Sequence, residues 1–137
     1  MIISIDGPSA TGKTTIAKLI LRFYDPISGS ICIGNDNIKN LSIKSLRKSI
    51  GYVSQEIFLF DGTVAENIAY SDEKININTV KNAAKLGQAD QFIRKLKLGY
   101  DTKVGERGQR LSVGQKQRIA ISRAIYKNPS LLIFDEA

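Results

Sequence analysis

One short segment constrains this chain more than any other, because residues 7–14 read GPSATGKT and fit the pattern G-x-x-x-x-G-K-[ST]. An apolar run precedes it and a helical pattern follows, which is the strand–loop–helix context that the pattern requires. Glycines let the backbone curl so that successive N–H groups form an anion-binding nest, and the helix adds its positive amino-terminal end. Lys13 brings a full charge to the terminal phosphates, and Thr14 offers a hydroxyl to Mg²⁺. We therefore expect a nucleoside triphosphate with Mg²⁺, bound by Gly7, Pro8, Ser9, Ala10, Thr11, Gly12, Lys13, Thr14 and Thr15.

The composition is typical of an ordinary globular domain. The 137 residues suit one domain, with 42% hydrophobic and 24% charged residues. The single cysteine, Cys32, lies in an apolar run, which predicts a buried thiol. No apolar run approaches the ~18 residues that indicate a transmembrane segment. The net charge is +7, but lysines and arginines are dispersed along the chain, so we expect solvated surface charge and no nucleic-acid partner.

Periodicity predicts an α/β fold with a helical insertion. No convincing strand falls within 63–98, whereas short apolar or β-branched runs predict strands elsewhere. The run at 131–134 is fully apolar, which is typical of the centre of a parallel sheet. The expected strands are 2–6, 30–33, 50–53 and 131–134, with a polar turn at 34–37. Five helices are expected. The first carries Ile16, Leu19, Ile20 and Phe23 on its apolar face, the second begins after the N-cap Ser42, and the third runs from the N-cap Asn78 to Gly87. The fourth carries Phe92, Ile93 and Leu96, and the fifth spans 114–127.

Two acidic residues, Asp135 and Glu136, follow the last apolar strand. Open α/β sheets bind their ligands at the carboxyl ends of their strands. A carboxylate at that position, next to a phosphate loop, can hold Mg²⁺ through water, and a second carboxylate can accept a proton from an attacking water molecule. We therefore expect Asp135 to be a metal ligand and Glu136 a general base.

Taken together with two further segments, these residues resemble the nucleotide-binding domain of ABC transporters. Residues 7–14 are similar to the family's Walker A motif and 131–135 to its Walker B motif, with Glu136 as the catalytic glutamate. Gln55 matches the Q-loop, and LSVGQ at 111–115 matches the signature, which is normally LSGGQ. Exporter-type members also have segments similar to KVGERG at 103–108 (the X-loop), RFYDP at 22–26 and FDGTVAENI at 60–68. The resemblance runs from about residue 2 to residue 137.

The resemblance implies a P-loop NTPase core with a mainly parallel sheet, built from 1–62 and 128–137, and a helical subdomain over approximately 63–127 with the X-loop and signature helix. It implies ATP hydrolysis that drives export, with ATP bound between two cassettes. The catalytic residues would be Glu136, Lys13 and Gln55, and the Mg²⁺ ligands Thr14, Gln55 and Asp135. The signature residues that would meet the γ-phosphate held by the opposite subunit are Leu111, Ser112, Val113, Gly114 and Gln115.

The same resemblance implies the partners and the location. One partner is a second nucleotide-binding domain, identical or different. The other is the transmembrane domain of an exporter, contacted through the Q-loop and X-loop. The expected location is therefore the cytoplasmic face of a membrane, with no transmembrane segment in this chain.

The sequence departs from the family pattern at several places. Ala10 and Val113 replace family glycines. The family also places an adenine-stacking aromatic residue before the Walker A motif and a switch histidine after the catalytic glutamate, and this sequence has no histidine. We therefore expect a domain truncated at both ends and poorly active by itself.

Two other functions remain open. The segment IDGPS at 5–9 is similar to nucleoside monophosphate kinases, which favours a small-molecule kinase, although that leaves Gln55 and 111–115 unexplained. The net charge of +7 favours an ABC-type ATPase of DNA repair or chromosome organisation. Those relatives insert a long coiled coil between Q-loop and signature, whereas residues 56–110 contain no sustained heptads.

Overall fold

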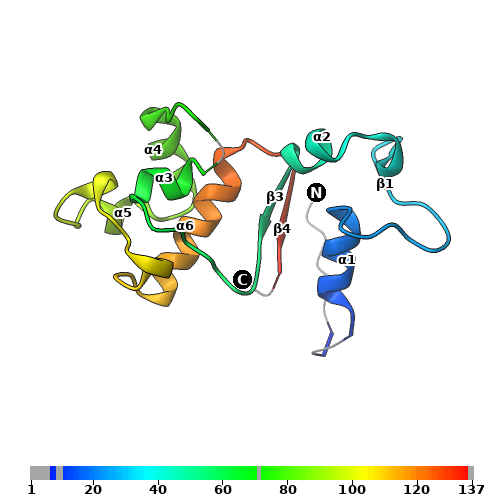
Figure 1. Cartoon of the computed structure of the whole chain (residues 1–137), viewed down its shortest axis with the longest axis horizontal. Coiled ribbons are helices and arrows are strands. Elements are labelled where there is room, and N and C mark those ends of the chain that lie inside the picture. The colour runs from blue at the N-terminus through cyan, green and yellow to red at the C-terminus, as the bar shows by residue number, and fades with distance from the viewer. Residues whose placement is uncertain (1–6, 9–10, 71, 136–137) are drawn as a thin grey trace.

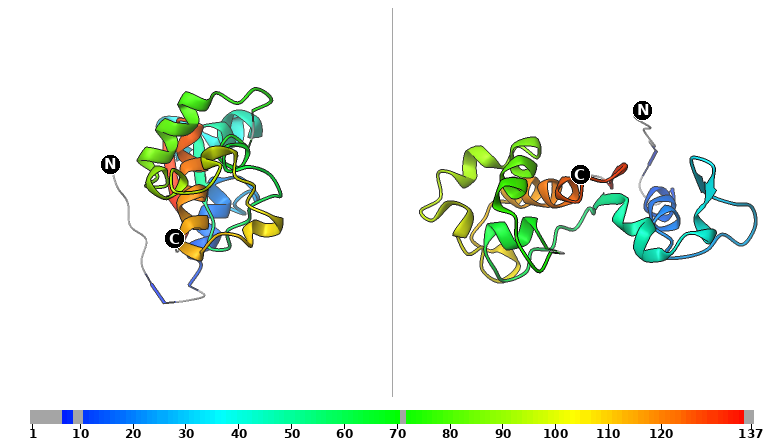
Figure 2. Two further views of the ribbon diagram at one scale, coloured as in Figure 1. Left: turned by 90° about the vertical axis from the view of Figure 1, so that its left-hand side faces the viewer. Right: turned by 90° about the horizontal axis from the view of Figure 1, so that it is seen from above.

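The computed structural model describes residues 7–8, 11–70 and 72–135. A parallel pair of strands, β3 (Ile50–Val53) and β4 (Leu131–Phe134), lies between a small amino-terminal part and a helical part (Figures 1 and 2). Ile50 pairs with Leu131 and Val53 with Phe134, so both strands end at the same edge. The expected strands at 50–53 and 131–134 are therefore confirmed, whereas the one at 2–6 lies outside the described residues. No helix within the described part of the chain is long and apolar enough to span a bilayer.

The first helix, α1 (Lys13–Ile20), begins directly after the glycine-rich loop. Its N-cap, Gly12, has φ 93°, a left-handed conformation that favours glycine. The helix ends sooner than expected, because Arg22 takes a positive φ of 53° and turns the chain away. Phe23 therefore lies beyond the helix, and its exposed ring lies 4.4 Å beneath the Arg47 guanidinium. The expected apolar face is wrong at Phe23 and also at Ile16, which is exposed.

A small hairpin and a short helix complete the amino-terminal part. Strand β1 (Cys32–Ile33) pairs antiparallel with β2 (Asp36–Asn37), followed by the 3₁₀ helix η1 (Ile38–Asn40) and α2 (Ile43–Lys48). The predicted cap Ser42 is confirmed, since its hydroxyl accepts from Ser45 N. Residues 36–37 form a strand and not the expected turn. The predicted burial of Cys32 is wrong: the thiol is exposed, because alternation along β1 directs Ile33, and not Cys32, to the apolar cluster.

The helical part has one extensive core. It is built from segments between residues 59 and 126, and its fully buried side chains include Leu59, Val64, Ile68, Val80 and Ile119. Helix α4 (Ile77–Leu86) is capped by Asn76 and not by Asn78, although Gly87 ends it as predicted. Helix α3 (Val64–Ile68) was not predicted. The elements are α3 (Val64–Ile68), α4 (Ile77–Leu86), α5 (Asp90–Ile93), the 3₁₀ helices η2 (Gly99–Asp101) and η3 (Glu106–Gly108), and α6 (Val113–Tyr126).

Helix α6 joins the helical part to the strand pair. It packs against α3 and α4 on one side, while Ala120 and Ala124 contact Val53 of β3 on the other. The approach to the strand is close, since a Cβ on Gly51 would lie 2.7 Å from the Ala124 main-chain oxygen. The opposite face of the pair packs against a second cluster that includes Leu21 at the end of α1. Helices α1 and α6 therefore lie on opposite sides of the strand pair (Figure 1).

The burial of β4 differs from the expectation of a fully buried central strand. Leu131 and Ile133 pack into the cluster on the α1 side of the pair. Leu132 and Phe134, on the other face, are 39% and 49% exposed. The burial expected of a central strand is therefore not reached, since Leu131 and Ile133 are half-buried and Leu132 and Phe134 exposed, because α6 covers β3 more than it covers β4.

Candidate functional site

The site is built around Asp135, immediately after β4. Its Oδ1 accepts a hydrogen bond of 3.0 Å from the Thr14 hydroxyl, which lies in the first turn of α1. Its Oδ2 accepts a hydrogen bond of 2.9 Å from the phenol of Tyr52 on β3. Asp135 is 7% exposed, so both oxygens of a nearly buried carboxylate are engaged. The adjacency of Thr14 and Asp135 that the sequence predicted is therefore observed.

The side chain of Lys13 folds back onto the described part of the glycine-rich loop. The Lys13 ammonium group donates to the carbonyl oxygens of Gly7 and Pro8, at 2.6 and 2.8 Å. The Thr11 hydroxyl also donates to the Pro8 carbonyl at 2.8 Å. These contacts bring Gly7 and Pro8 next to the lysine at the amino-terminal end of α1, where backbone N–H groups have no intrahelical acceptor. Ser9 and Ala10 lie outside the described residues.

The oxygen atoms of Thr14 and Asp135 fit a magnesium ion. Mg²⁺ takes oxygen ligands and is bound through one or two carboxylates together with substrate phosphates, not by an all-protein cage. The pair offers one hydroxyl and one carboxylate oxygen only 3.0 Å apart. No group of three His, Cys, Asp or Glu side chains suited to a metal occurs among residues 7–8, 11–70 and 72–135. The two oxygen atoms could therefore serve a cation that takes its other ligands from a phosphate group and water.

Tyr52 was not predicted as a site residue. Burial of its phenol, reinforced by the hydrogen bond and the negative charge of Asp135, raises the pKa of Tyr52 to about 12. The phenol therefore stays protonated near neutral pH and acts as a donor to the carboxylate. The alternation of strand 50–53 places Tyr52 on a defined face, but nothing in the local sequence indicates which residue it meets.

The predicted residue Gln55 lies just beyond the edge of the strand pair at which Asp135 is found. Gln55 is exposed and follows β3 by two residues, in a bend where the Ser54 hydroxyl donates to the Glu56 carbonyl at 2.6 Å. Because β3 and β4 are parallel, this bend and Asp135 both follow the carboxyl ends of the strands. Glu136 lies outside the described residues.

The segment 111–115 opens helix α6 with a capping box. Gln115 N donates to the Ser112 hydroxyl at 3.3 Å, and Ser112 N donates to the Gln115 side chain at 2.9 Å. Leu111 is buried, Gly114 is exposed and Val113 is 79% exposed. The amino-terminal ends of α1 and α6 point toward the same edge but lie on opposite sides of the strand pair (Figure 1). The fold therefore does not bring Ser112 beside Lys13 within one copy of the chain.

The segment 103–108 is tied to the residues that follow Gln55. Val104 is fully buried, its N–H donates to the Gly62 carbonyl at 2.9 Å, and Thr63 forms a β-bridge with Lys103. At its other end the Lys116 ammonium of α6 donates to the Arg107 carbonyl at 2.9 Å. The connector therefore links the segment after Gln55 to the first turns of α6.

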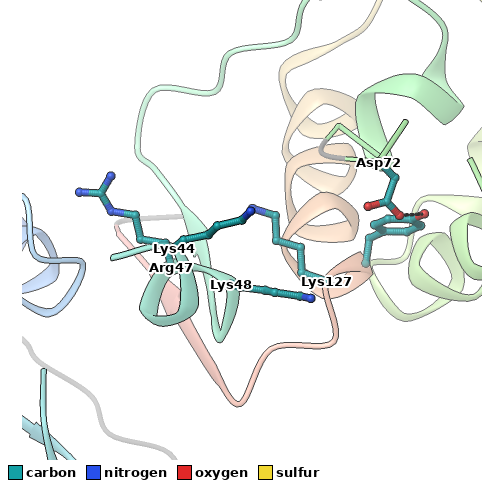
Figure 3. Close-up of a pocket in the computed structure, with 6 residues that line it drawn as sticks. Lys44, Arg47, Lys48, Asp72 and Lys127 are labelled. Atoms are coloured by element: carbon teal, nitrogen blue, oxygen red, sulfur yellow. Dashed lines mark hydrogen bonds between the residues drawn. The ribbon is translucent and has the colours of Figure 1, made fainter. Parts of the chain in front are cut away.

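A groove lined by basic residues lies at the opposite edge of the strand pair (Figure 3). Its lysines, Lys44 and Lys48 of α2 and Lys127 after α6, come from segments far apart in sequence. The expectation of dispersed basic residues therefore holds along the chain but not in space. The groove's acidic residue, Asp72, accepts a hydrogen bond of 2.7 Å from Tyr126. Because the groove lies near the amino ends of β3 and β4, it is separate from Thr14 and Asp135.

With this geometry in view, comparisons with known proteins give one consistent result. The sequence model of the ABC transporter family matches residues 1–137. ABC transporter B family member 29, chloroplastic, of Arabidopsis thaliana is 53% identical over 137 residues, which cover 98% of this chain and 22% of the relative. The uncharacterized ABC transporter ATP-binding protein YknU of Bacillus subtilis (strain 168) is 49% identical over 136 residues, covering 99% of this chain and 23% of the relative.

A solved structure, that of a bacterial Atm1-family ABC exporter with ATP bound, superposes with a TM-score of 0.88 at 48% identity. It covers 94% of this chain, which in turn covers 23% of that protein. The chain thus spans about a fifth of the length of these relatives.

Proposed function

This chain belongs to the ABC transporter family, and we propose that it forms the ATP-binding and ATP-hydrolysing part of an exporter. The observation that carries the proposal is the 3.0 Å contact between Thr14 and Asp135, which joins the phosphate loop to the end of β4 across 121 positions of the sequence. The family match, the relatives named as ABC transporters and the solved structure named as an ABC exporter favour this function over a small-molecule kinase or a DNA-repair ATPase. ATP and Mg²⁺ are the proposed ligands.

The loop residues have the chemistry needed for the terminal phosphates. We assign Lys13 to the β- and γ-phosphates as a charge-assisted donor, held in place beforehand by the carbonyls of Gly7 and Pro8. Residues 7–15, apart from Pro8, would supply backbone N–H groups to the phosphates. Thr14 and Asp135 would hold Mg²⁺, which when bound neutralises charge on the outer phosphates.

Glu136 and Gln55 are proposed to act on the attacking water. Glu136 directly follows Asp135 in the sequence, and as a general base it would take the proton of that water. Gln55, in the bend after β3, would orient the water and contact the metal–phosphate group. Both assignments depend on the family pattern and on the parallel arrangement of β3 and β4.

The signature segment is proposed to complete the site of a second copy or of a homologous partner. Its capping box fixes Ser112 at the start of α6, where exposed N–H groups and the helix dipole favour an anion. Since α1 and α6 lie on opposite sides of the strand pair, Ser112 and Lys13 of one copy are proposed to contact different nucleotides. One copy alone is therefore proposed to hydrolyse ATP slowly.

The helical residues 63–127 are proposed to act as a subdomain of a core formed by 1–62 and 128–137. The connector at 103–108 and the segment after Gln55 are joined by main-chain hydrogen bonds, so they would move together. We assign this joined surface to contact with the exporter's transmembrane domain, on the cytoplasmic face of the membrane.

The test uses the full-length protein that contains this chain, purified with its membrane domain. Glu136→Gln should retain ATP binding but lose steady-state release of inorganic phosphate, whereas Lys13→Ala should weaken binding. Lys18→Ala, an exposed charge on the same helix, is the matched control. Unchanged phosphate release in Glu136→Gln, or phosphate transfer to a nucleoside monophosphate in its place, would contradict the proposal.

A further inference from the structure

We propose that Tyr52 is a positioning residue that orients the Asp135 carboxylate for Mg²⁺ and nucleotide. The phenol donates to Oδ2 at 2.9 Å while Oδ1 faces the Thr14 hydroxyl at 3.0 Å. The hydrogen bond from Tyr52 holds Oδ2 of Asp135 against β3, so that Oδ1 faces the phosphate loop. The inference rests on the proposed function, because it concerns the same site.

The backbone at Asp135 is fixed independently of the side chain. Its N–H donates to the Val53 carbonyl at 2.9 Å, which continues the parallel ladder one step beyond β4. What the ladder does not fix is rotation of the carboxylate about its own bonds, since terminal sp³–sp² torsions are broad. A donor on one oxygen removes that freedom, and Tyr52 is the donor that meets Oδ2.

The register of the strands explains why Tyr52 can reach this carboxylate. Tyr52 pairs with Ile133, and Asp135 is the next residue along that strand on the same face. An aromatic side chain is long enough to reach such a diagonal neighbour. The ring of Tyr52 packs in the cluster that contains Leu131 and Ile133, so it is held by apolar contacts before its hydroxyl acts.

The chemistry of a phenol suits this position. A lysine or arginine at the same place would neutralise Asp135 and compete with a divalent cation for its charge. The neutral hydroxyl donates one hydrogen bond and leaves the carboxylate negative, as hydrogen-bond partners of metal ligands commonly do. Tyr52 therefore orients Asp135 without weakening its attraction for Mg²⁺.

The chain offers a matched control in Tyr126. Its phenol also donates to an aspartate, Asp72, at 2.7 Å, but this pair lies in the groove at the far edge of the strand pair (Figure 3). Tyr52→Phe and Tyr126→Phe each remove one oxygen atom and one phenol–carboxylate hydrogen bond. A general effect of losing such a bond would appear in both variants, whereas an effect on Asp135 would appear only in Tyr52→Phe.

The experiment measures ATP affinity of the full-length protein by equilibrium binding, in EDTA and over a titration of free Mg²⁺. Mg²⁺ should increase the ATP affinity, and in Tyr52→Phe we expect the free Mg²⁺ concentration that gives half of this increase to rise about tenfold or more. The ATP affinity in EDTA should be unchanged. Unchanged affinity in EDTA also shows that the phosphate loop is folded. Tyr126→Phe should match the wild type in both conditions. In an Asp135→Asn background, Tyr52→Phe should produce no further shift.

Three results would overturn the inference: a wild-type Mg²⁺ titration in Tyr52→Phe, an equal loss of affinity with and without Mg²⁺, or the same shift in Tyr126→Phe. Failure of the proposed function looks different, because the wild-type protein itself would then show no ATP binding. Mn²⁺ in place of Mg²⁺ provides a spectroscopic readout, since the electron paramagnetic resonance signal of bound Mn²⁺ reports ion binding without turnover.

Discussion

The Arg123 guanidinium of α6 donates to both the main-chain and the side-chain oxygen of Asn67, at 2.8 Å from Nε and 3.0 Å from Nη2. Its Nη1 donates to the Phe58 carbonyl at 2.9 Å. Asn67 is fully buried and also donates to the carbonyls of Phe60 and Thr63. The signature helix is therefore joined by one side chain to the segment that follows Gln55.

Arg123→Ala should lower the free energy of unfolding by about 1–3 kcal/mol, because it removes the donors to both oxygen atoms of the buried Asn67 and to the Phe58 carbonyl. Arg123→Lys should recover only part of this loss, since an ammonium group cannot reproduce the planar set of donors. Chemical denaturation measures both. Arg118→Ala, an exposed arginine on the same helix, should change stability by less than about 0.5 kcal/mol. If Arg123→Ala and Arg118→Ala lowered the free energy of unfolding equally, the contact with Asn67 would not be a source of stability.

Lys13→Ala should weaken Mg-ATP binding by about ten- to a hundredfold, because it deletes a charge-assisted contact of roughly 1.5–3 kcal/mol. Isothermal titration calorimetry is the measurement, with Lys18→Ala as the matched removal of a positive charge from an exposed position on α1. The assignment of the phosphate loop would be wrong if the two variants bound Mg-ATP equally well.

The chain has a capping box at Ser112 and another at Thr63, and comparing variants of the two distinguishes an effect of Ser112 on stability from an effect on function. Ser112→Ala and Thr63→Ala each remove the hydroxyl of an N-cap that is paired with a residue three positions later. Both should lower stability by about 1 kcal/mol. Only Ser112 variants should impair ATP-driven association of the nucleotide-binding domains, most strongly Ser112→Arg, which also adds bulk. Light scattering of the complete domain with ATP gives the association. Normal association in Ser112→Arg would exclude the proposed contact with the opposite nucleotide.

The stability of the helical part should depend on pH through Asp90. The Tyr100 phenol donates to Asp90 Oδ1 at 2.7 Å, and Arg94 forms an ion pair with Oδ2 at 2.9 Å. The hydrogen bond from Tyr100 is the largest cause that lowers the pKa of Asp90, with a smaller contribution from Arg94 and opposition from burial. Because the folded pKa lies below the unfolded value of about 3.9, the stabilisation is complete above that pH and is lost as the pH falls through the folded pKa.

Tyr100→Phe should therefore flatten the decline in stability below about pH 4, besides lowering stability at neutral pH. Urea unfolding at a series of pH values from 6 to 3 measures the slope. Tyr24→Phe, which removes an exposed phenol, should leave the slope unchanged. An identical acid slope in Tyr100→Phe and the wild type would show that Asp90 does not depend on Tyr100.

The sequence by itself determined the features whose causes are local. Gly12, Lys13 and Thr14 specify a left-handed turn, a charge and a hydroxyl within three residues, so the phosphate loop could be predicted with its chemistry. Ser42 and Ser112 bring their own capping interactions, and the apolar runs at 50–53 and 131–134 are confirmed as parallel strands. These predictions depend on the capping hydrogen bonds and the apolar pattern within a single helix, loop or strand.

Only the tertiary structure decided which distant residues meet. Tyr52 reaches Asp135 across 83 positions because the register of β3 with β4 places them diagonally on one face, and neither residue's neighbours reveal that register. Packing likewise decided the exposure of Cys32 and the short length of α1. Long-range pairing is set by the sum of many weak apolar contacts over the whole domain, and for that reason no local pattern contains it.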